Sequence, residues 1–263
     1  MKSEIQLKNS NCSVIITDGE LLSFKKEDIE FIHQKGSRGW RNSDDEMFPI
    51  IGPTSKNNFN VHTKKGIAKQ DQHGLLRELN YSLVSINKDS ANFIKKYKKN
   101  TKIKNSKFPK KSSEEELFWP YDFTFQKNFK LKKDLLKIEF IIISEIGMPF
   151  MLGYHPAFLL SNSGKETLET EALKISIKDV YTAGSHAFPV FNSDKITLKN
   201  IDKNDLKITT KGFNNFMLWT EVDNMLCIEP ITQYTSYTDQ KFSEKNMSLS
   251  KGINRFSVQF KIL

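Results

Sequence analysis

The spacing of apolar residues is the feature that most constrains the fold of this chain. Residues 13–17 (SVIIT) and 20–24 (ELLSF) form two apolar runs separated only by Asp18-Gly19. Asp-Gly between two such runs is typical of a tight β-hairpin, because both turn positions need a positive φ. The first part of the sequence is therefore predicted to form two paired antiparallel strands.

Short apolar segments with turn residues between them continue along the rest of the chain. Strands are predicted at residues 28–33, 81–86, 122–126, 135–144, 173–177, 195–198, 206–210, 216–220, 225–229 and 255–262. No stretch of 12 residues carries the apolar stripe of an amphipathic helix. This pattern predicts an all-β chain folded as a large sandwich or barrel. Because no linker or internal repeat is visible, we interpret residues 1–263 as one domain.

Two predicted strands carry further information about burial. Residues 135–144 include a nearly continuous β-branched and aromatic run, which predicts a strand covered on both faces. Pro149 and Pro156 bracket the segment that contains His155, and proline is rare in central strands. We therefore expect His155 at a strand end or on a loop, where a rigid β scaffold often presents functional side chains.

Membrane insertion and secretion are disfavoured by the sequence. It contains no apolar run of about 18 residues, so no membrane-spanning helix is expected. The first residues, MKSEIQLK, lack the apolar core of a secretory signal. Cys12 and Cys227 show no metal-binding or redox spacing. These features predict a cytoplasmic protein with reduced thiols.

The net charge of +9 comes from one segment. Residues 88–111 contain ten lysines and a single acid, Asp89, and the rest of the chain is electrically neutral. Aromatic residues are sparse in this segment, so a platform for stacking nucleic-acid bases is poorly supported. We interpret the segment as a solvated loop or hairpin edge protected by lysines. It could also bind anionic surfaces weakly.

One histidine and one carboxylate stand out as candidates for acid–base chemistry. In residues 225–230 (MLCIEP), alternation along a strand places Cys227 and Glu229 on the same face, with Glu229 near the end of an apolar strand. Partial desolvation there would raise the pKa of Glu229 towards the range useful for a general base. His155 lies in the phrase GYHP, and His73 precedes Gly74, which permits close approach of the backbone to a ligand.

Each of these residues also has an ordinary structural interpretation when it is considered alone. Glu229 could be a strand-end glutamate in water, and His155 and His73 could be structural or turn histidines. No pair of His, Cys or Asp residues has the spacing of zinc ligands, so no metal is expected. Glycine-rich phosphate loops and nucleophile elbows are also missing from the sequence.

Taken together, the motifs resemble those of the aldose 1-epimerase, or galactose mutarotase-like, family. The resemblance runs over nearly the whole chain. The matching motifs are Asp18-Gly19, residues 47–52 (MFPIIG), 73–77 (HGLLR), 119–123 (WPYDF), 148–158 (MPFMLGYHPAF) and 227–230 (CIEP). The detailed match is closest to the LacX-like, or hexose-phosphate mutarotase, branch. The resemblance implies a large antiparallel β-sandwich, in agreement with the period-two pattern.

The resemblance also implies a reaction and roles for named residues. Mutarotation interconverts the α and β anomers of a free aldose and needs no cofactor. Glu229 would be the base at the C1 hydroxyl, and His155 would be the acid at the ring oxygen. His73 would bind the ring oxygen or a neighbouring hydroxyl, and the partner is a small-molecule sugar.

Two arginines match substrate-binding positions of the hexose-phosphate branch. Arg41 and Arg77 would hold a sugar phosphate, since guanidinium groups bind phosphate with two parallel hydrogen bonds. Three acids, residues 44–46, stand close to Arg41 and would oppose phosphate unless they turn away. Asp194 is a weak match to the aspartate that grips the sugar in galactose mutarotases. The lysine-rich segment interrupts a region that is usually shorter in the family.

Two other functions stay open on the sequence. One is a non-catalytic carbohydrate-binding protein with the same fold. The other is an interaction protein that uses the lysines of residues 88–111 on an anionic polymer or membrane, with steeply salt-dependent binding.

Overall fold

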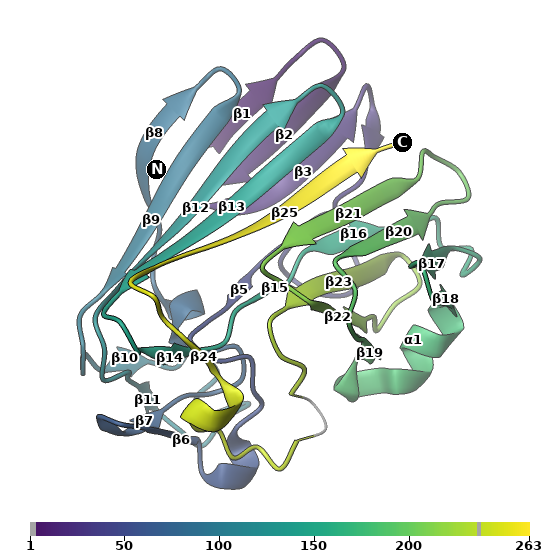
Figure 1. Cartoon of the computed structure of the whole chain (residues 1–263). Coiled ribbons are helices and arrows are strands. Elements are labelled where there is room, and N and C mark those ends of the chain that lie inside the picture. Colours follow the sequence, from purple (N-terminus) through teal and green to yellow (C-terminus); the bar gives the residue numbers. More distant parts are fainter. Residues whose placement is uncertain (1–3, 236–237) are drawn as a thin grey trace.

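Long antiparallel strands form the larger of two main layers in the computed structural model, which describes residues 4–235 and 238–263 (Figure 1). This layer is a nine-stranded sheet of order β18-β17-β20-β21-β25-β13-β12-β9-β8. In that order the strands are Lys174–Ser176, Thr167–Glu169, Lys195–Lys199, Leu206–Lys211, Ile253–Ile262, Leu135–Ser144, Phe123–Lys132, Ser90–Tyr97 and Ser82–Asn87.

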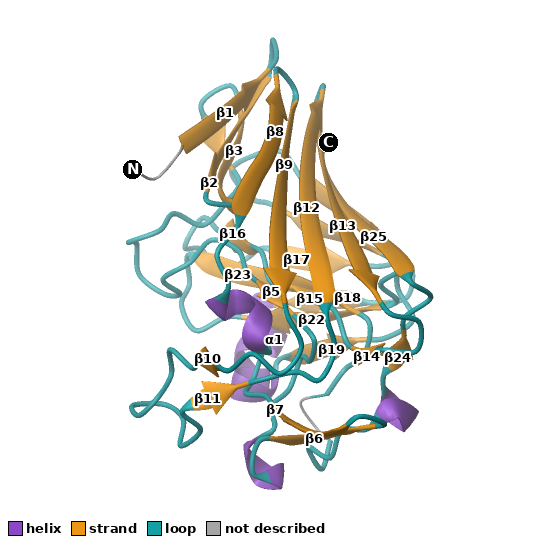
Figure 2. Ribbon diagram, turned by 90° about the vertical axis from the view of Figure 1, so that its left-hand side faces the viewer, coloured by secondary structure: helices purple, strands orange, loops and turns teal. Residues whose placement is uncertain are grey.

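Two smaller sheets form the second layer behind the first (Figures 1 and 2). One has the order β19-β22-β23-β15-β5, and β16 also pairs with β23. Its strands are Phe188–Val190, Asn215–Trp219, Met225–Ile231, Gly153–Tyr154 and Glu46–Met47, with β16 at Ala157–Leu159. The other joins β1 to β4, which are Glu4–Lys8, Cys12–Thr17, Glu20–Lys26 and Ile29–Glu30.

Three two-stranded ribbons complete the β structure, mostly at one end of the long strands (Figure 2). They pair β6 with β7, β10 with β11 and β14 with β24, and their bounds are Asn60–Thr63, Gly66–Lys69, Ile103–Lys104, Glu116–Leu117, Pro149–Phe150 and Ser248–Leu249. Short 3₁₀ turns cover Ser55–Asn57, Leu75–Glu78, Gly184–His186 and Glu244–Asn246. The predicted large antiparallel β-sandwich is confirmed.

The Asp18-Gly19 hairpin forms as predicted between β2 and β3. Both turn residues have a positive φ, 51° for Asp18 and 82° for Gly19. Thr17 pairs with Glu20 across the turn, so the two strands meet at a two-residue loop. This left-handed geometry matches the twist of the flanking strands, which is why Asp-Gly selects it.

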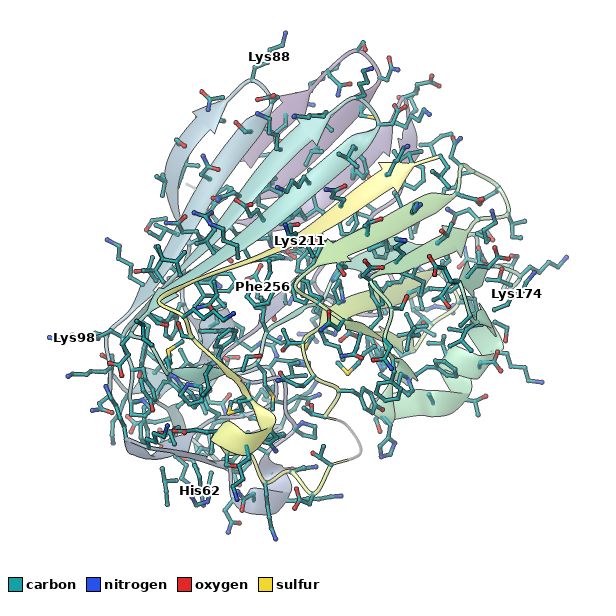
Figure 3. All side chains as sticks on the ribbon, in the orientation of Figure 1. His62, Lys88, Lys98, Lys174, Lys211 and Phe256 are labelled. Atoms are coloured by element: carbon teal, nitrogen blue, oxygen red, sulfur yellow. The ribbon has the colours of Figure 1, made fainter. Side chains whose placement is uncertain are left out.

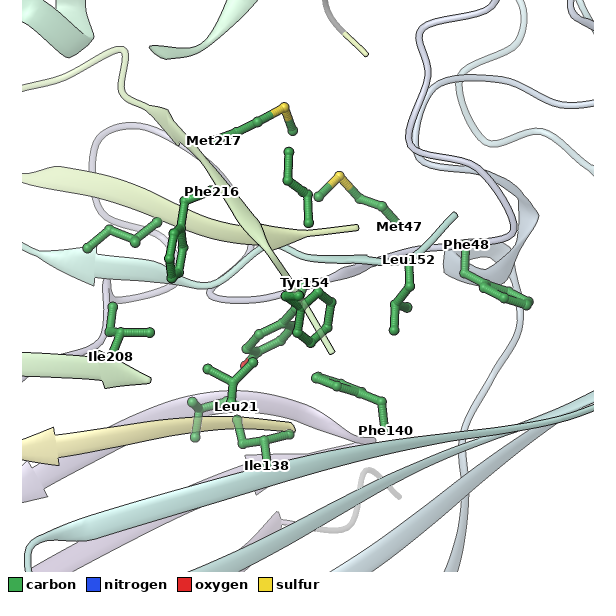
Figure 4. Close-up of a cluster of buried hydrophobic side chains, with 14 of the residues drawn as sticks. Leu21, Met47, Phe48, Ile138, Phe140, Leu152, Tyr154, Ile208, Phe216 and Met217 are labelled. Carbon is green, nitrogen blue, oxygen red and sulfur yellow. The ribbon is translucent and has the colours of Figure 1, made fainter. Parts of the chain in front are cut away.

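The core lies between the two layers (Figure 4). Ile138 and Phe140 of β13 reach it from the large sheet, while Tyr154 and Phe216 reach it from the second layer. Phe140 and Tyr154 pack with ring centroids 5.0 Å apart. Aromatic contacts of this kind bury large apolar surfaces, which dominate the stability of such a core.

Strand β13 corrects one expectation from the sequence. It has the predicted bounds, but Ile143 is 39% exposed, and Lys137 and Glu139 are only partly buried. Residues 135, 137, 139, 141 and 143 lie on the outer face, and of these Ile141 alone is buried. The outer face of an antiparallel sheet can meet water on one side, so most of this strand is covered on its inner face alone.

Among the described residues there is one α-helix, α1 (Ile177–Ala183), and it begins where the sequence predicted the end of a strand. Ser176 accepts a hydrogen bond from Asp179 N, and its own backbone N–H donates to the Asp179 side chain. This capping box satisfies the first free N–H groups of the helix. The helix has seven residues, so a search for a 12-residue amphipathic stripe misses it.

The lysine-rich segment of residues 88–111 contains more structure than a loop. It includes all of β9, which pairs with β8 on one side and β12 on the other. Lys88 and Lys98 project outwards near opposite ends of this strand (Figure 3). Lys95 departs from the expected solvated role, since it points inwards and is 5% exposed. In the described residues, no helix is long and apolar enough to cross a membrane.

Candidate active site

His155 lies between two short strands of the second layer, as predicted from its neighbouring prolines. It follows β15 and precedes β16. Its backbone N–H donates to Asp45 O over 2.8 Å, and its carbonyl accepts from Asp45 N over 3.2 Å. These paired bonds fix the backbone of His155 without placing it inside a regular strand, so the side chain can leave the plane of the sheet.

Glu229 lies in β23, whose residues are all buried. Ala157 pairs with Cys227 in the antiparallel register of β16 and β23. Residue 155 lies two positions before Ala157, and residue 229 lies two positions after Cys227. The same antiparallel register therefore brings them opposite each other. His155 Nε2 is 3.4 Å from Glu229 Oε1, and the two side chains are 8% and 2% exposed. The two residues selected from the sequence are therefore neighbours in the fold, although 74 positions separate them.

Burial changes the protonation of both groups. Desolvation raises the pKa of Glu229 well above its ordinary value. Desolvation, with a further contribution from the Arg77 cation, lowers the pKa of His155 to about 3. Both shifts favour the uncharged forms, in which the proton lies on the carboxyl group and the imidazole is neutral. A shift of that proton across the 3.4 Å contact would give a carboxylate beside an imidazolium.

His73 is the third member of the cluster. Its ring centroid lies 5.5 Å from that of His155, in an edge-to-face arrangement. Its Nδ1 is buried and has no hydrogen-bond partner among residues 4–235 and 238–263. Desolvation, followed by the charge of Arg77, lowers its pKa well below the ordinary value. His73 is therefore a neutral imidazole with a nitrogen available to a ligand.

The turn that carries His73 is tightly constrained. His73 has a φ of 75°, which is unusual for a residue with a side chain, and Gly74 has a φ of 70°. A Cβ on Gly74 would lie 2.3 Å from Phe48 O, so only glycine fits there. His73 N donates to Ile51 O over 2.8 Å, and Phe48 N donates to His73 O over 3.1 Å.

Two tryptophans complete the walls around His155. The Trp40 ring lies 4.3 Å from the imidazole between centroids, and the Trp219 ring lies 6.2 Å away. His33, an unassigned histidine in the sequence, contacts the Trp40 carbonyl over 3.0 Å and so helps to hold that loop. Neither tryptophan was predicted from the sequence to lie at the site. Aromatic residues are suited to stacking on a sugar, but no sequence motif links Trp40 or Trp219 to His155.

The two arginines predicted to bind phosphate lie in different environments. Arg77 Nη2 is 2.7 Å from Asp45 Oδ2, and both side chains are mostly buried. Arg41 is exposed and does not line the cavity beside Arg77. Asp194, the weak candidate for gripping the sugar, is exposed at the start of β20. The structure therefore brings Arg77 close to the histidines but does not bring the two arginines together as a phosphate clamp.

The acids at residues 44–46 turn inwards, and each one has a cationic partner. Lys127 Nζ lies 2.6 Å from both Asp44 Oδ2 and Glu46 Oε1 and is fully buried. Lys95 Nζ lies 3.8 Å from Glu46 Oε2. Burial alone would lower the pKa of Lys127, but Asp44 and Glu46 outweigh that effect and raise it. Because Glu46 pairs with Tyr154 in the β5–β15 register, this charge network anchors the strand that leads into His155.

A cavity of about 480 Å³ lies beside these residues, and His73, His155 and Glu229 are not among the residues that line it. Asp45 and Arg77 line it, and so do Tyr81, Lys95 and Ser106. In all, five carboxylate side chains line it against two cations. Its polar walls suit hydroxyl groups, which both donate and accept hydrogen bonds, better than they suit an anion.

Comparison with known proteins places the chain in a family. The family model described as aldose 1-epimerase matches residues 3–245. The chain belongs to the aldose 1-epimerase family. No curated protein matches the sequence significantly.

Solved structures share the fold of this family member at low sequence identity. A galactose mutarotase related enzyme from Lactobacillus acidophilus is 20% identical, with a TM-score of 0.77, over 99% of this chain and 97% of the other. A galactose mutarotase-like protein from Lactobacillus casei is 16% identical, with a TM-score of 0.76, over 99% and 100%. An aldose epimerase homologue from C. elegans is 12% identical, with a TM-score of 0.68, over 100% and 99%.

One residue of this aldose 1-epimerase family member extends the chemistry available at the site. Cys227 lies on the same face of β23 as Glu229, and His155, Cys227 and Glu229 each offer a ligand atom within 4.8 Å of the others. Nitrogen, sulfur and oxygen donors in this arrangement suit zinc. Sequence spacing could not reveal the group, because His155 enters it from the segment between β15 and β16, far along the chain from Cys227 and Glu229. Burial raises the pKa of the Cys227 thiol well above its ordinary value, so binding a metal there would require removal of a strongly held proton.

Proposed function

We propose that the protein interconverts the α and β anomers of a free hexose, with Glu229 as the base and His155 as the acid. The observation that carries this proposal is the 3.4 Å contact between Glu229 Oε1 and His155 Nε2 in a buried site. The two oxygens on which mutarotation acts, the C1 hydroxyl and the ring oxygen, are bonded to one carbon. An adjacent acid and base can therefore reach both at once.

The proton count of the pair supports these roles. In the uncharged forms that burial favours, the proton lies on Glu229, and its transfer to His155 produces the carboxylate and imidazolium that the reaction needs. Sugar hydroxyl groups that hydrogen-bond to the charged forms would favour this transfer, because they replace some of the lost solvation. Each proton-transfer role is typically worth about 10²–10⁴-fold in rate.

The steps balance without any external reagent. Glu229 removes the proton of the C1 hydroxyl, and His155 gives its proton to the ring oxygen. The bond between C1 and the ring oxygen breaks, which leaves an open-chain aldehyde. Rotation about the C1–C2 bond presents the other face of the carbonyl, and closure returns each proton to its donor. We assign His73 to a hydrogen bond with the ring oxygen or a neighbouring hydroxyl.

An unphosphorylated sugar fits the charges of the site better than a hexose phosphate. Arg77 is already paired with Asp45 at 2.7 Å, and its remaining N–H groups suit single sugar hydroxyls. Arg41 is exposed outside the cavity, and carboxylates outnumber cations along the cavity wall. Phosphate binding would require Arg77 to exchange its partner and Arg41 to move towards it.

The proposal is tested by polarimetry or NMR exchange on freshly dissolved anomers. Glucose, galactose and their 6-phosphates are compared with and without the protein. We expect faster exchange for at least one free hexose and a smaller effect on the 6-phosphates. Equal rates with and without protein for all four sugars would contradict the proposed activity.

The alternative is a non-catalytic carbohydrate-binding protein. Trp40, which covers one side of His155, is the observation that favours it, because aromatic rings stack on sugars in binding sites as well as in active sites. This alternative predicts saturable sugar binding by calorimetry while the rate of anomer exchange stays at the spontaneous value.

A further inference from the structure

Two side chains of the lysine-rich segment of residues 88–111 contact the turn that leads into His73. Asn105 is 1% exposed, and its Nδ2 donates to Asp71 Oδ2 over 3.0 Å. Lys107 Nζ donates to Gln72 O over 2.9 Å and lies 3.5 Å from Asp71 Oδ1. Asp71 and Gln72 are the two residues immediately before His73.

These contacts hold a turn that would not be stable by itself. A non-glycine residue in the left-handed region is strained, so the surrounding structure has to stabilise it. Asp71 supplies part of that stabilisation, because its carbonyl accepts from Gly74 N over 2.9 Å and its carboxylate accepts from Gln72 N over 2.6 Å. Asn105 and Lys107 in turn hold the Asp71 carboxylate, and Lys107 also holds the carbonyl of Gln72.

Asn105 is itself fixed by its own segment. Its backbone N–H donates to Glu115 O over 2.8 Å, and its side chain also donates to Glu114 O over 2.9 Å. Ile103 pairs with Leu117 in the short β10–β11 ribbon, which closes the loop around Asn105. The loop therefore holds the buried side chain of Asn105 in a fixed position against Asp71.

We propose that Asn105 and Lys107 are positioning residues, which set the orientation of the His73 imidazole by clamping the turn at Asp71 and Gln72. The clamp connects a segment with no assigned role to the candidate active site. The expected effect of the clamp on the rate of anomer exchange rests on the proposed function. The effect on His73 itself follows from the contacts alone.

The test compares Lys107→Met with Lys110→Met, an exposed lysine three residues further along the same segment. In Lys107→Met we expect changed NMR chemical shifts of the His73 ring and a fall in kcat of about tenfold, which corresponds to about 1.4 kcal/mol. Lys107→Arg should recover most of the rate. Lys110→Met should match the wild type in both measurements.

Asn105→Ala tests the other half of the clamp, with thermal unfolding as a check of the fold. We expect changed NMR chemical shifts of the His73 ring and a fall in kcat larger than any change in KM. If the wild type accelerates no anomer exchange, the proposed function fails, and the chemical shifts of the His73 ring still decide the clamp. Chemical shifts of the His73 ring that are the same in wild type, Lys107→Met and Asn105→Ala would overturn the inference.

Discussion

Glu229 Oε1 lies 3.4 Å from His155 Nε2, and both side chains are withdrawn from water. The contact joins the fully buried strand β23 to a loop that is held by backbone bonds to Asp45. In water a carboxylic acid loses its proton well before an imidazolium does. In this site burial reverses that order and favours the uncharged carboxyl and imidazole over the ion pair.

Replacing Glu229 by glutamine tests the proposed base. Glu229→Gln keeps the size of the side chain but cannot accept the proton of the C1 hydroxyl. We expect the rate of anomer exchange to fall about 10²–10⁴-fold. Polarimetry measures this loss, and Glu171→Gln, whose side chain is 87% exposed, is the matched control. Full activity in Glu229→Gln would exclude the carboxylate as the base.

The same substitution makes a prediction about stability and pH. The folded-state pKa of Glu229 is raised, so the native state holds a proton that the unfolded chain releases above its ordinary pKa of 4.5. The contribution of Glu229 to stability therefore falls as pH rises above about 4.5, until the folded-state pKa is reached. Glutamine carries no such penalty.

Thermal unfolding of wild type and Glu229→Gln between pH 4.5 and 8.5 measures this effect. We expect the Tm of the variant to exceed that of the wild type by a margin that grows with pH. Each kcal/mol corresponds to about 2–4 °C in a chain of this size. A margin that is constant or shrinks with pH would show that Glu229 is not desolvated in the native state.

Lys127 is expected to be essential to the buried charge network. Lys127→Met leaves Asp44 and Glu46 buried without their shared cation, which should lower the free energy of unfolding by about 3–5 kcal/mol. Urea denaturation measures the loss. Lys130→Met, on the same strand but 48% exposed, should change stability by no more than about 1 kcal/mol. Equal effects of the two substitutions would mean that the network contributes little.

Asp45 is expected to control selection against phosphorylated sugars. Asp45→Asn removes the charge that occupies Arg77 and leaves the backbone bonds to His155 in place. We expect the ratio of kcat/KM for a hexose 6-phosphate to that for the free hexose to rise about tenfold. Asp223→Asn, which breaks an exposed ion pair with Arg38, is the control. An unchanged ratio in Asp45→Asn would show that Arg77 does not meet the phosphate.

The fold class followed from local signals in the sequence. Asp18-Gly19 predicts its hairpin because few residue pairs tolerate two positive φ angles in succession. The bounds of β13 were likewise predicted correctly at residues 135–144. Helix α1 was missed because its signal is a short capping box, and the exposure of Ile143 was missed because one strand does not reveal whether a second layer covers its outer face.

The sequence by itself determined the all-β architecture and, through motifs shared with a family, selected His73, His155 and Glu229 as candidate site residues. Only the tertiary structure decided what surrounds them. Trp40 meets His155, Arg77 is paired with Asp45, and Lys107 belongs to the support of His73. The physical reason is that strand pairing follows from local periodicity, whereas burial and charge pairing depend on side chains from distant strands that meet only when the layers pack.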